Sequence, residues 1–161
     1  MRKINEIIIH CSATPEGKDF TVDDIRQWHL ARKFSDIGYH YVVYRDGSVH
    51  KGRAENLVGA HCVGHNAHSI GVCYIGGVAA DGKTPKDTRT PQQKVALRQL
   101  VNQLKFYYPD AQVHGHNEMT CKRAQYEAGF NIAECSRHCA NCKFAAKACP
   151  SFNATTEYAH I

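Results

Sequence analysis

Two short apolar runs constrain the fold of this chain more than any other feature. Residues 6–10 read EIIIH and residues 70–75 read IGVCYI, and both runs are rich in β-branched side chains. A strand that is covered on both faces reads as such a continuous run, whereas a strand with one face in water alternates apolar and polar residues. The sequence therefore predicts a sheet whose two faces are covered by other elements.

Helix-start signals lie between and after these runs. Thr21 opens the sequence TVDD, which is close to a capping box, and Thr90 with Pro91 places a cap before a proline at the first helical position. The second helix is long and has a continuous apolar face, formed by Leu97, Leu100, Val101, Leu104 and Tyr108. Both signals predict helices that can cover the sheet.

The remaining segments complete a mixed architecture. Asp46-Gly47 lies between residues 40–45 and 48–51 and predicts a hairpin, and residues 111–116, AQVHGH, predict a further strand. A short helix is expected after Pro150. This order of elements predicts an α/β (α+β) fold with a central mixed β-sheet flanked by helices. No repeat or linker divides the 161 residues, so we expect one domain over 1–161.

Charge and hydropathy disfavour several classes of function. The net charge is +5, but Lys and Arg are spread along the chain without a run of five or more, which argues against a nucleic-acid partner. The apolar run at residues 7–9 is too short for the core of a signal peptide or for a membrane span. We therefore expect a protein made in the cytoplasm without a signal peptide and with no membrane insertion.

Histidine and cysteine are unusually frequent. The chain has 11 His and 8 Cys, and closely spaced cysteines in a cytosolic chain indicate metal binding or catalysis before disulfides. His10 ends the first predicted strand, His116 ends the last, and Cys149 lies in the turn KACP, while a catalytic zinc ion needs three such ligands and an open position. Spacing alone does not select these three, because His114 lies on the same predicted face as His116. A hydrogen-bonded histidine is the simpler interpretation of either.

Other histidines and cysteines have no predicted role in chemistry. His29 and His50 are expected to be ordinary surface or boundary residues. Cys11 and Cys73 are expected to be buried, unreactive thiols.

Six stretches, in order along the chain, resemble one enzyme family. They read IIIHCSAT, IRQWH, DIGYHYVVYRDGSV, VGAHCVGHNAHSIGVCYIGG, GHNE and KACPSF. Together they resemble the N-acetylmuramoyl-L-alanine amidases (amidase type 2) of the phage T7 lysozyme type, which are related to the peptidoglycan recognition proteins of animals. The resemblance covers residues 4–118 and 147–153.

The resemblance implies a zinc site and two catalytic side chains. It implies that His10, His116 and Cys149 are the ligands of a catalytic Zn²⁺, and it prefers His116 to His114. Tyr39 and Lys147 match the two catalytic positions that are not ligands, with Tyr39 positioning water or relaying a proton and Lys147 stabilising the oxyanion.

The resemblance also implies a substrate. It implies hydrolysis of the amide that joins N-acetylmuramic acid to L-alanine in peptidoglycan, and it places His61 in the cleft as a substrate contact. Asn66 and Ser69, on the same predicted loop, are further candidates for holding sugar or peptide. We expect an endolysin-like monomer that acts on the bacterial cell wall after release.

A cysteine-rich insertion departs from the family pattern. It covers about residues 119–146 and carries four cysteines, Cys121, Cys135, Cys139 and Cys142. Their spacing is compatible with a second, structural zinc site, and two disulfides or four free thiols remain alternatives. Because the insertion lies between the second and third predicted ligands, we expect it to border the cleft and to influence specificity.

Two other functions compete with catalysis. The chain can be read as a non-catalytic peptidoglycan-binding or regulatory protein, which the presence of Cys149, Tyr39 and Lys147 disfavours. The insertion can also be read as a zinc module that binds nucleic acid or a protein, which its weak charge and few aromatic residues disfavour.

Overall fold

A computed structural model of the protein describes residues 2–119 and 148–161. Its centre is a five-stranded sheet in which every neighbouring pair is parallel except the β3–β4 hairpin. In sheet order the strands are β4 (Val49–Lys51), β3 (Tyr41–Val43), β5 (Ser69–Tyr74), β1 (Glu6–Cys11) and β7 (Gln112–Gly115). The mixed sheet with helices confirms the predicted fold class, and the Asp46-Gly47 turn connects the predicted hairpin.

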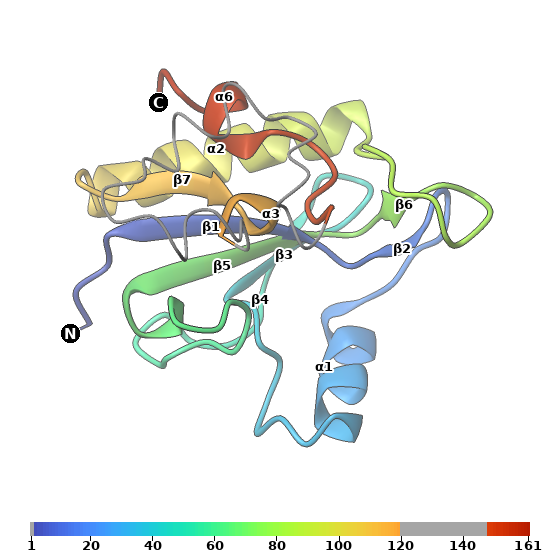
Figure 1. Cartoon of the computed structure of the whole chain (residues 1–161), viewed down its shortest axis with the longest axis horizontal. Coiled ribbons are helices and arrows are strands. Elements are labelled where there is room, and N and C mark those ends of the chain that lie inside the picture. The colour runs from blue at the N-terminus through green and yellow to red at the C-terminus, as the bar shows by residue number, and fades with distance from the viewer. Residues whose placement is uncertain (1, 120–147) are drawn as a thin grey trace.

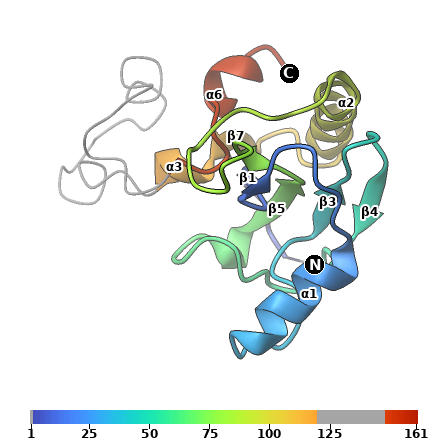
Figure 2. The same ribbon diagram turned by 90° about the vertical axis from the view of Figure 1, so that its right-hand side faces the viewer.

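Helices cover both faces of this sheet. The long helix α2 (Pro91–Tyr107) and the short helix α6 (Ala154–Glu157) lie on one side, and α1 (Val22–Ala31) lies on the other (Figures 1 and 2). In β1, Ile7 and Ile9 belong to the same core cluster as the apolar face of α2, whereas Ile8 belongs to a cluster on the opposite face. All three are fully buried, as the continuous apolar run predicted.

Small elements join the main ones and were not predicted. The two-residue strands β2 (Thr14–Pro15) and β6 (Gly77–Val78) pair in parallel, and a 3₁₀ turn, η1 (Asn66–His68), leads into β5. The last predicted strand ends earlier than expected, because Gly115 closes β7 and the following residue begins the short helix α3 (His116–Met119). His116 therefore follows the strand instead of ending it.

The expectation for His29 was wrong. It lies on the inner face of α1 with 7% of its surface exposed, and its Nδ1 accepts a hydrogen bond from the Gly38 N–H at 2.8 Å. The chain comes this close because Gly38 lacks a side chain: a Cβ there would lie 2.2 Å from the carbonyl oxygen of Ala60. His50 is half-buried and stacks on Tyr44, as expected of a boundary residue.

Among residues 2–119 and 148–161, no helix is long and apolar enough to cross a membrane. The cysteine-rich insertion lies outside the described residues from residue 120 onward, so the single-domain boundary and the insertion remain predictions.

Gln93 joins the start of α2 to the sheet. Thr90 and Gln93 form a capping box, in which Gln93 Oε1 accepts from the Thr90 N–H at 3.0 Å. The Gln93 amide also donates to the carbonyls of Val43, the last residue of β3, at 3.2 Å and of Ile75, which follows β5, at 3.0 Å. The Gln93 side chain is completely buried, so water does not reach the two carbonyls past it.

Replacing Gln93 with Ala should destabilise the fold. The substitution removes the side-chain half of the capping box and the Gln93 donor to the buried Ile75 carbonyl, whereas the Val43 carbonyl still accepts from the Ile75 N–H. These losses typically cost about 1–3 kcal/mol in total. Urea denaturation of Gln93→Ala measures the loss. Gln99→Ala, at an exposed position of the same helix, is the control and should change the unfolding free energy by less than about 0.5 kcal/mol. Equal stability of the two variants would contradict this role.

Candidate metal centre

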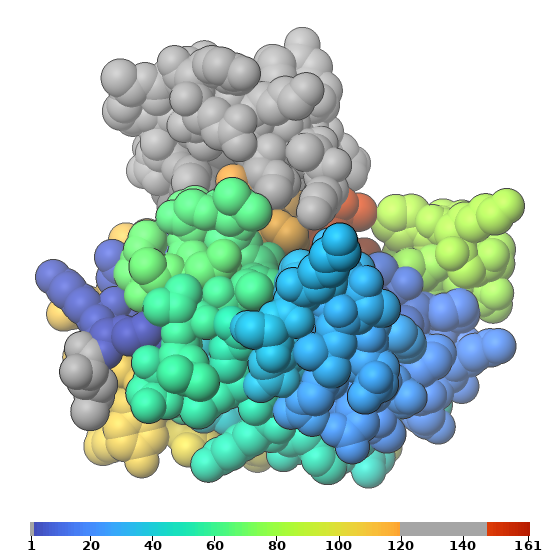
Figure 3. Space-filling view, turned by 90° about the horizontal axis from the view of Figure 1, so that it is seen from below, coloured from blue at the N-terminus to red at the C-terminus, as the bar shows by residue number. Residues whose placement is uncertain are grey.

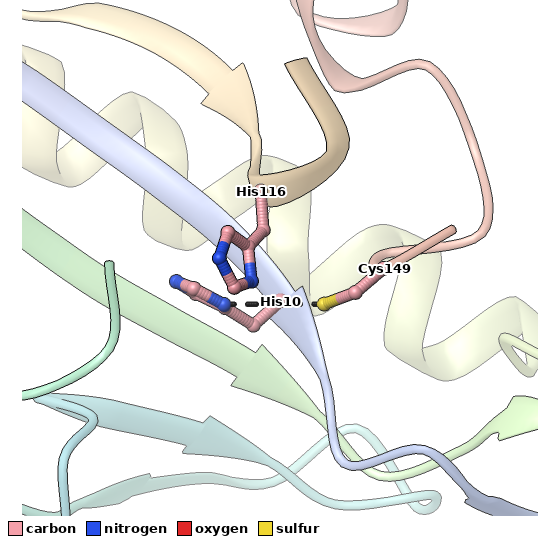
Figure 4. Close-up of side chains that lie close together, drawn as sticks. All are labelled: His10, His116 and Cys149. Atoms are coloured by element: carbon pink, nitrogen blue, oxygen red, sulfur yellow. Dashed lines mark hydrogen bonds between the residues drawn. The ribbon is translucent and has the colours of Figure 1, made fainter. Parts of the chain in front are cut away.

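Three side chains that are far apart in sequence meet at one end of the sheet. His10, His116 and Cys149 place one donor atom each within 4.8 Å of the others (Figure 4). His10 Nδ1 lies 3.9 Å from Cys149 Sγ, and the two imidazole rings are 4.7 Å apart between centroids. Ligands of a tetrahedral zinc ion with ordinary Zn–N and Zn–S bonds lie about 3.6 Å apart. The cluster is therefore close to the dimensions of a zinc site.

Strand pairing brings the two histidines together. His10 is the fifth residue of β1, and its neighbour Ile9 pairs with Gly115 at the end of β7. His116 follows Gly115 directly and begins α3. His10 near the end of β1 and His116 directly after β7 thus lie at the carboxyl ends of two adjacent strands, where open sheets place their sites.

A tightly packed C-terminal segment carries Cys149. The Asn117 N–H donates to the Cys149 carbonyl at 2.6 Å, and the Tyr74 hydroxyl donates to the Pro150 carbonyl at 2.6 Å. Gly115 allows this approach, since a Cβ there would lie 2.8 Å from the Pro150 ring. These contacts fix the position of the sulfur beside β1.

The environment of the sulfur is also defined. The Cys11 N–H donates to Cys149 Sγ at 3.2 Å. The hydrogen bond with the Cys11 thiol, together with burial, raises the pKa of the Cys149 thiol well above its usual range. A cation that binds the thiolate has to displace this proton.

His61 contacts the Nε2 atom of the His10 ring and helps to hold that ring in place. His61 Nδ1 lies 2.9 Å from His10 Nε2, and His61 Nε2 lies 3.3 Å from Ser69 Oγ. The ring packs on Gly71 of β5, where a Cβ would approach it to 2.6 Å. Burial, then the neighbouring His40 and His116, lower the pKa of His61 to about 3, so this ring is neutral at physiological pH. A neutral ring can accept from His10 Nε2–H, which leaves the lone pair of His10 Nδ1 directed toward the cluster.

The three residues predicted to contact substrate take part in the hydrogen bonds that hold His10 and the neighbouring loop. His61 is 9% exposed and Ser69 is completely buried. Asn66 Oδ1 accepts from the backbone N–H groups of His61 and Cys62, both at 2.9 Å, and so holds the loop. Contact of these three with a substrate stays a prediction, and Ser69 has no exposed surface through which to make one.

Tyr39 lies beside the cluster. Its ring is 5.1 Å from the His10 ring and 5.4 Å from the His29 ring, measured between centroids. Burial raises the pKa of the Tyr39 hydroxyl well above its usual value, so it carries its proton at neutral pH. It is available as a hydrogen-bond donor. Lys147 and the four insertion cysteines lie outside the described residues, so their roles stay predictions.

His114 does not join the cluster. It is buried, and its Nδ1 lies 3.1 Å from Thr155 Oγ. Cys11 and Cys73 are buried, as expected.

His40 is a further supporting histidine that the sequence did not predict. His40 Nδ1 accepts from the Gly71 N–H at 3.0 Å, and its Nε2 lies 3.0 Å from the carbonyl oxygen of Leu57. Its ring is 5.8 Å from that of His61, and both are packed against Gly59, where a Cβ would come within 2.8 Å of each. The glycines near histidines in VGAH and SIGV were the available signal, because they permit close packing of rings.

Comparison with known proteins relates this chain to one enzyme family. A profile of the family described as N-acetylmuramoyl-L-alanine amidase matches residues 1–151. The chain is 42% identical over 116 residues to an endolysin of Escherichia phage T7, covering 72% of this chain and 76% of that protein.

Solved structures share the fold. An N-acetylmuramoyl-L-alanine amidase, LysC from Clostridium intestinale, superposes with a TM-score of 0.69 at 25% identity and covers 97% of this chain and 82% of its own. The Drosophila peptidoglycan recognition protein PGRP-LB superposes with a TM-score of 0.62 at 27% identity, covering 74% of this chain and 72% of its own.

The buried histidines should make the metal-free protein sensitive to acid. Burial lowers the pKa of His40 and of His61, so the folded state leaves both neutral where the unfolded chain, with histidine pKa values of about 6.5, binds protons. The contribution of these two histidines to the unfolding free energy is fully present above about pH 6.5. It falls as the pH decreases toward their pKa values in the folded state, by at most about 1.4 kcal/mol per pH unit for each histidine. Urea denaturation with chelator, between pH 8 and pH 4.5, measures this slope.

The variant His40→Gln tests the assignment. Glutamine keeps a donor and an acceptor but binds no proton, so the dependence of stability on pH should become shallower. His160→Gln, at an exposed position, is the control and should keep the wild-type slope. An unchanged slope in His40→Gln would show that this ring does not titrate differently in the two states.

Proposed function

The chain belongs to the N-acetylmuramoyl-L-alanine amidase family, and we propose that His10, His116 and Cys149 hold the zinc ion with which it cleaves peptidoglycan. The reaction of this family is hydrolysis of the amide between N-acetylmuramic acid and L-alanine. The observation that carries the proposal is the convergence of these three donors within 4.8 Å.

The donor set fits zinc. Two imidazoles and one thiolate are preferred ligands of this ion, and three protein ligands leave a fourth position for water or substrate, as in catalytic sites. A zinc ion held there supplies a bound water of lowered pKa and polarises the scissile carbonyl.

His61 positions His10 for this role. We assign the His10 Nε2–H as the donor to His61 Nδ1, 2.9 Å away, so that the His61 Nε2–H then donates to Ser69 Oγ, 3.3 Å away. With these donors and acceptors, His10 is the tautomer whose Nδ1 is unprotonated and can bind an ion. We therefore assign His61 and Ser69 to orienting a ligand, and Asn66 to holding their loop.

Tyr39 contributes a proton donor. Its protonated hydroxyl, on a ring in contact with that of His10, is suited to orient water or to donate to the oxygen on which negative charge develops. Lys147, two residues before Cys149, is proposed as a second stabiliser of that charge on the basis of the family motif.

Cell-wall lysis is the setting that the relatives support. The protein from phage T7 is an endolysin, and we propose an endolysin-like or wall-remodelling role for this chain, acting on the bacterial cell wall as a monomer. The insertion cysteines are proposed to hold a second, structural zinc ion. The non-catalytic alternative predicts binding of muropeptides without release of L-alanine amino groups.

Replacing Cys149 with Ser should remove the catalytic metal. A supporting residue of a metal site typically contributes 10–100-fold in affinity or activity, so loss of a ligand should lower amidase activity by at least about 100-fold. Activity is measured as new L-alanine amino groups in purified peptidoglycan, with zinc content by elemental analysis. Cys62→Ser, at a buried thiol outside the cluster, is the control and should keep both. Full activity in Cys149→Ser would contradict the proposal.

Replacing Tyr39 with Phe separates chemistry from metal binding. The ring and its packing on His10 and His29 remain, so zinc content should be unchanged, while kcat should fall about 100-fold through loss of the donor. Tyr107→Phe, at an exposed ring, is the matched control. Wild-type kcat in Tyr39→Phe would remove this residue from the catalytic machinery.

A further inference from the structure

A second group of metal-ligand side chains lies outside the centre described above. Glu6, His65 and His68 place one donor atom each within 4.8 Å of the others. His65 Nδ1 lies 3.0 Å from Glu6 Oε2, and His68 Nε2 lies 3.2 Å from the same oxygen. Two imidazoles from one short segment thus converge on one carboxylate.

Local structure holds the two imidazoles side by side. His65 precedes the 3₁₀ turn η1 and His68 ends it, and the His68 N–H donates to the His65 carbonyl at 3.3 Å. Residues three apart in a 3₁₀ turn project in the same direction, because the turn contains three residues. The two rings consequently lie 5.8 Å apart between centroids.

Sheet pairing brings the carboxylate to them. Glu6 pairs with Ser69 in the parallel β1–β5 register, and Ser69 follows His68 directly. The neighbouring Asn5 N–H donates to the His68 carbonyl at 3.0 Å. The Arg2 guanidinium also holds the turn, donating to the carbonyls of Asn66 at 3.2 Å and Ala67 at 3.1 Å. The three ligands are therefore arranged by the backbone before any ion binds.

The dimensions and the donor types suit a zinc-like ion. Nitrogen and oxygen ligands of a tetrahedral zinc ion lie about 3.4 Å apart, close to the 3.0 Å and 3.2 Å observed here. Two imidazoles with one carboxylate bind borderline divalent ions such as zinc, nickel and copper, whereas calcium and magnesium prefer oxygen ligands alone.

The cluster is accessible from solvent. The side chains of Glu6, His65 and His68 are 17%, 28% and 37% exposed. In the space-filling view the start of the chain and the segment around residues 60–70 form one continuous surface (dark blue and green, Figure 3). An ion can enter directly, with water filling its remaining position.

We propose that Glu6, His65 and His68 form a second binding site for a divalent ion of the zinc type. Glu6 and His10 are four residues apart in an extended strand, which separates them by about 13 Å, so one ion cannot serve both clusters. A bound ion links the beginning of β1 to the loop of residues 61–68. That loop carries His61, so the site stabilises the support of His10 from a distance.

Metal binding to the full chain tests the site by difference. Nickel stoichiometry and affinity are measured by calorimetry and elemental analysis in Cys149→Ser, which disables the first centre, and in the same variant with His65→Ala and His68→Ala. The triple variant should bind one nickel equivalent fewer. The matched control adds His50→Ala and His160→Ala to Cys149→Ser and should lose none. Equal stoichiometry in the triple variant and in Cys149→Ser would overturn the proposal.

Two further measurements distinguish ligation from a change in folding. Glu6→Gln in the Cys149→Ser background removes only the carboxylate charge and should weaken the nickel equivalent at least tenfold, while circular dichroism and the metal-free melting temperature stay close to those of the parent. Cobalt bound at this site should give no thiolate charge-transfer band, because its ligands contain no sulfur. Unchanged nickel affinity in Glu6→Gln would contradict the assignment. A thiolate charge-transfer band from the cobalt equivalent that is lost on replacing His65 and His68 would also contradict it. These outcomes do not depend on amidase activity.

Discussion

The pairing of β1 with a parallel neighbour on each side is the constraint on which the candidate metal centre depends. It satisfies the backbone hydrogen bonds on both edges of β1, while the alternation of side chains directs successive residues to opposite faces of the sheet. Ile7 and Ile9 pack against the α2 side, whereas Glu6, Ile8 and His10 alternate onto the other face. One face of β1 thus packs in the hydrophobic core, and the other face carries Glu6 and His10, which belong to the two proposed metal sites. Because His116 follows Gly115, the partner of Ile9 in β7, the β1–β7 register also sets the distance between two of the proposed ligands.

The position of Cys149, the third proposed ligand, depends on a different set of contacts. Arg89, whose side chain is 2% exposed, makes ion pairs with Asp87 and Glu157, and its guanidinium lies 3.3 Å from the centroid of the Phe152 ring. The Tyr74 hydroxyl adds a hydrogen bond to the Pro150 carbonyl. A buried, paired arginine of this kind holds the C-terminal segment to the loop before α2. Cys149 is therefore positioned by the segment that follows it as well as by β1.

Much of the fold was predictable because its signals are local. The continuous apolar run of β1, the Asp46-Gly47 turn and the caps at Thr21 and Thr90 each depend on a few adjacent residues, and each was confirmed. The two-residue strands β2 and β6 are too short to show a period. Nothing in AQVHGH indicates that the strand ends before His116, since this end is set by pairing with β1.

The support of the site was less predictable than its ligands. Family motifs indicated His10, His116 and Cys149, but the burial of His29 and the contact of His61 with His10 depend on Gly38 and Gly71, which lie on neighbouring segments of the fold. Gly38 and Gly71 leave room for these rings only after the chain has folded. Ser69, a predicted substrate contact, is completely buried beside His61, and its contact with a substrate stays a prediction.

The central claim is that His10 binds zinc through Nδ1 because His61 occupies its Nε2. A crystal structure of the zinc-loaded protein, with anomalous scattering measured at the zinc absorption edge, tests it directly. The account predicts a peak within about 2.1 Å of His10 Nδ1, bonded also to His116 and to Cys149 Sγ at about 2.3 Å, with the His10–His61 hydrogen bond intact. A peak bonded to His10 Nε2, with His61 displaced, or the absence of zinc between these three residues would contradict it.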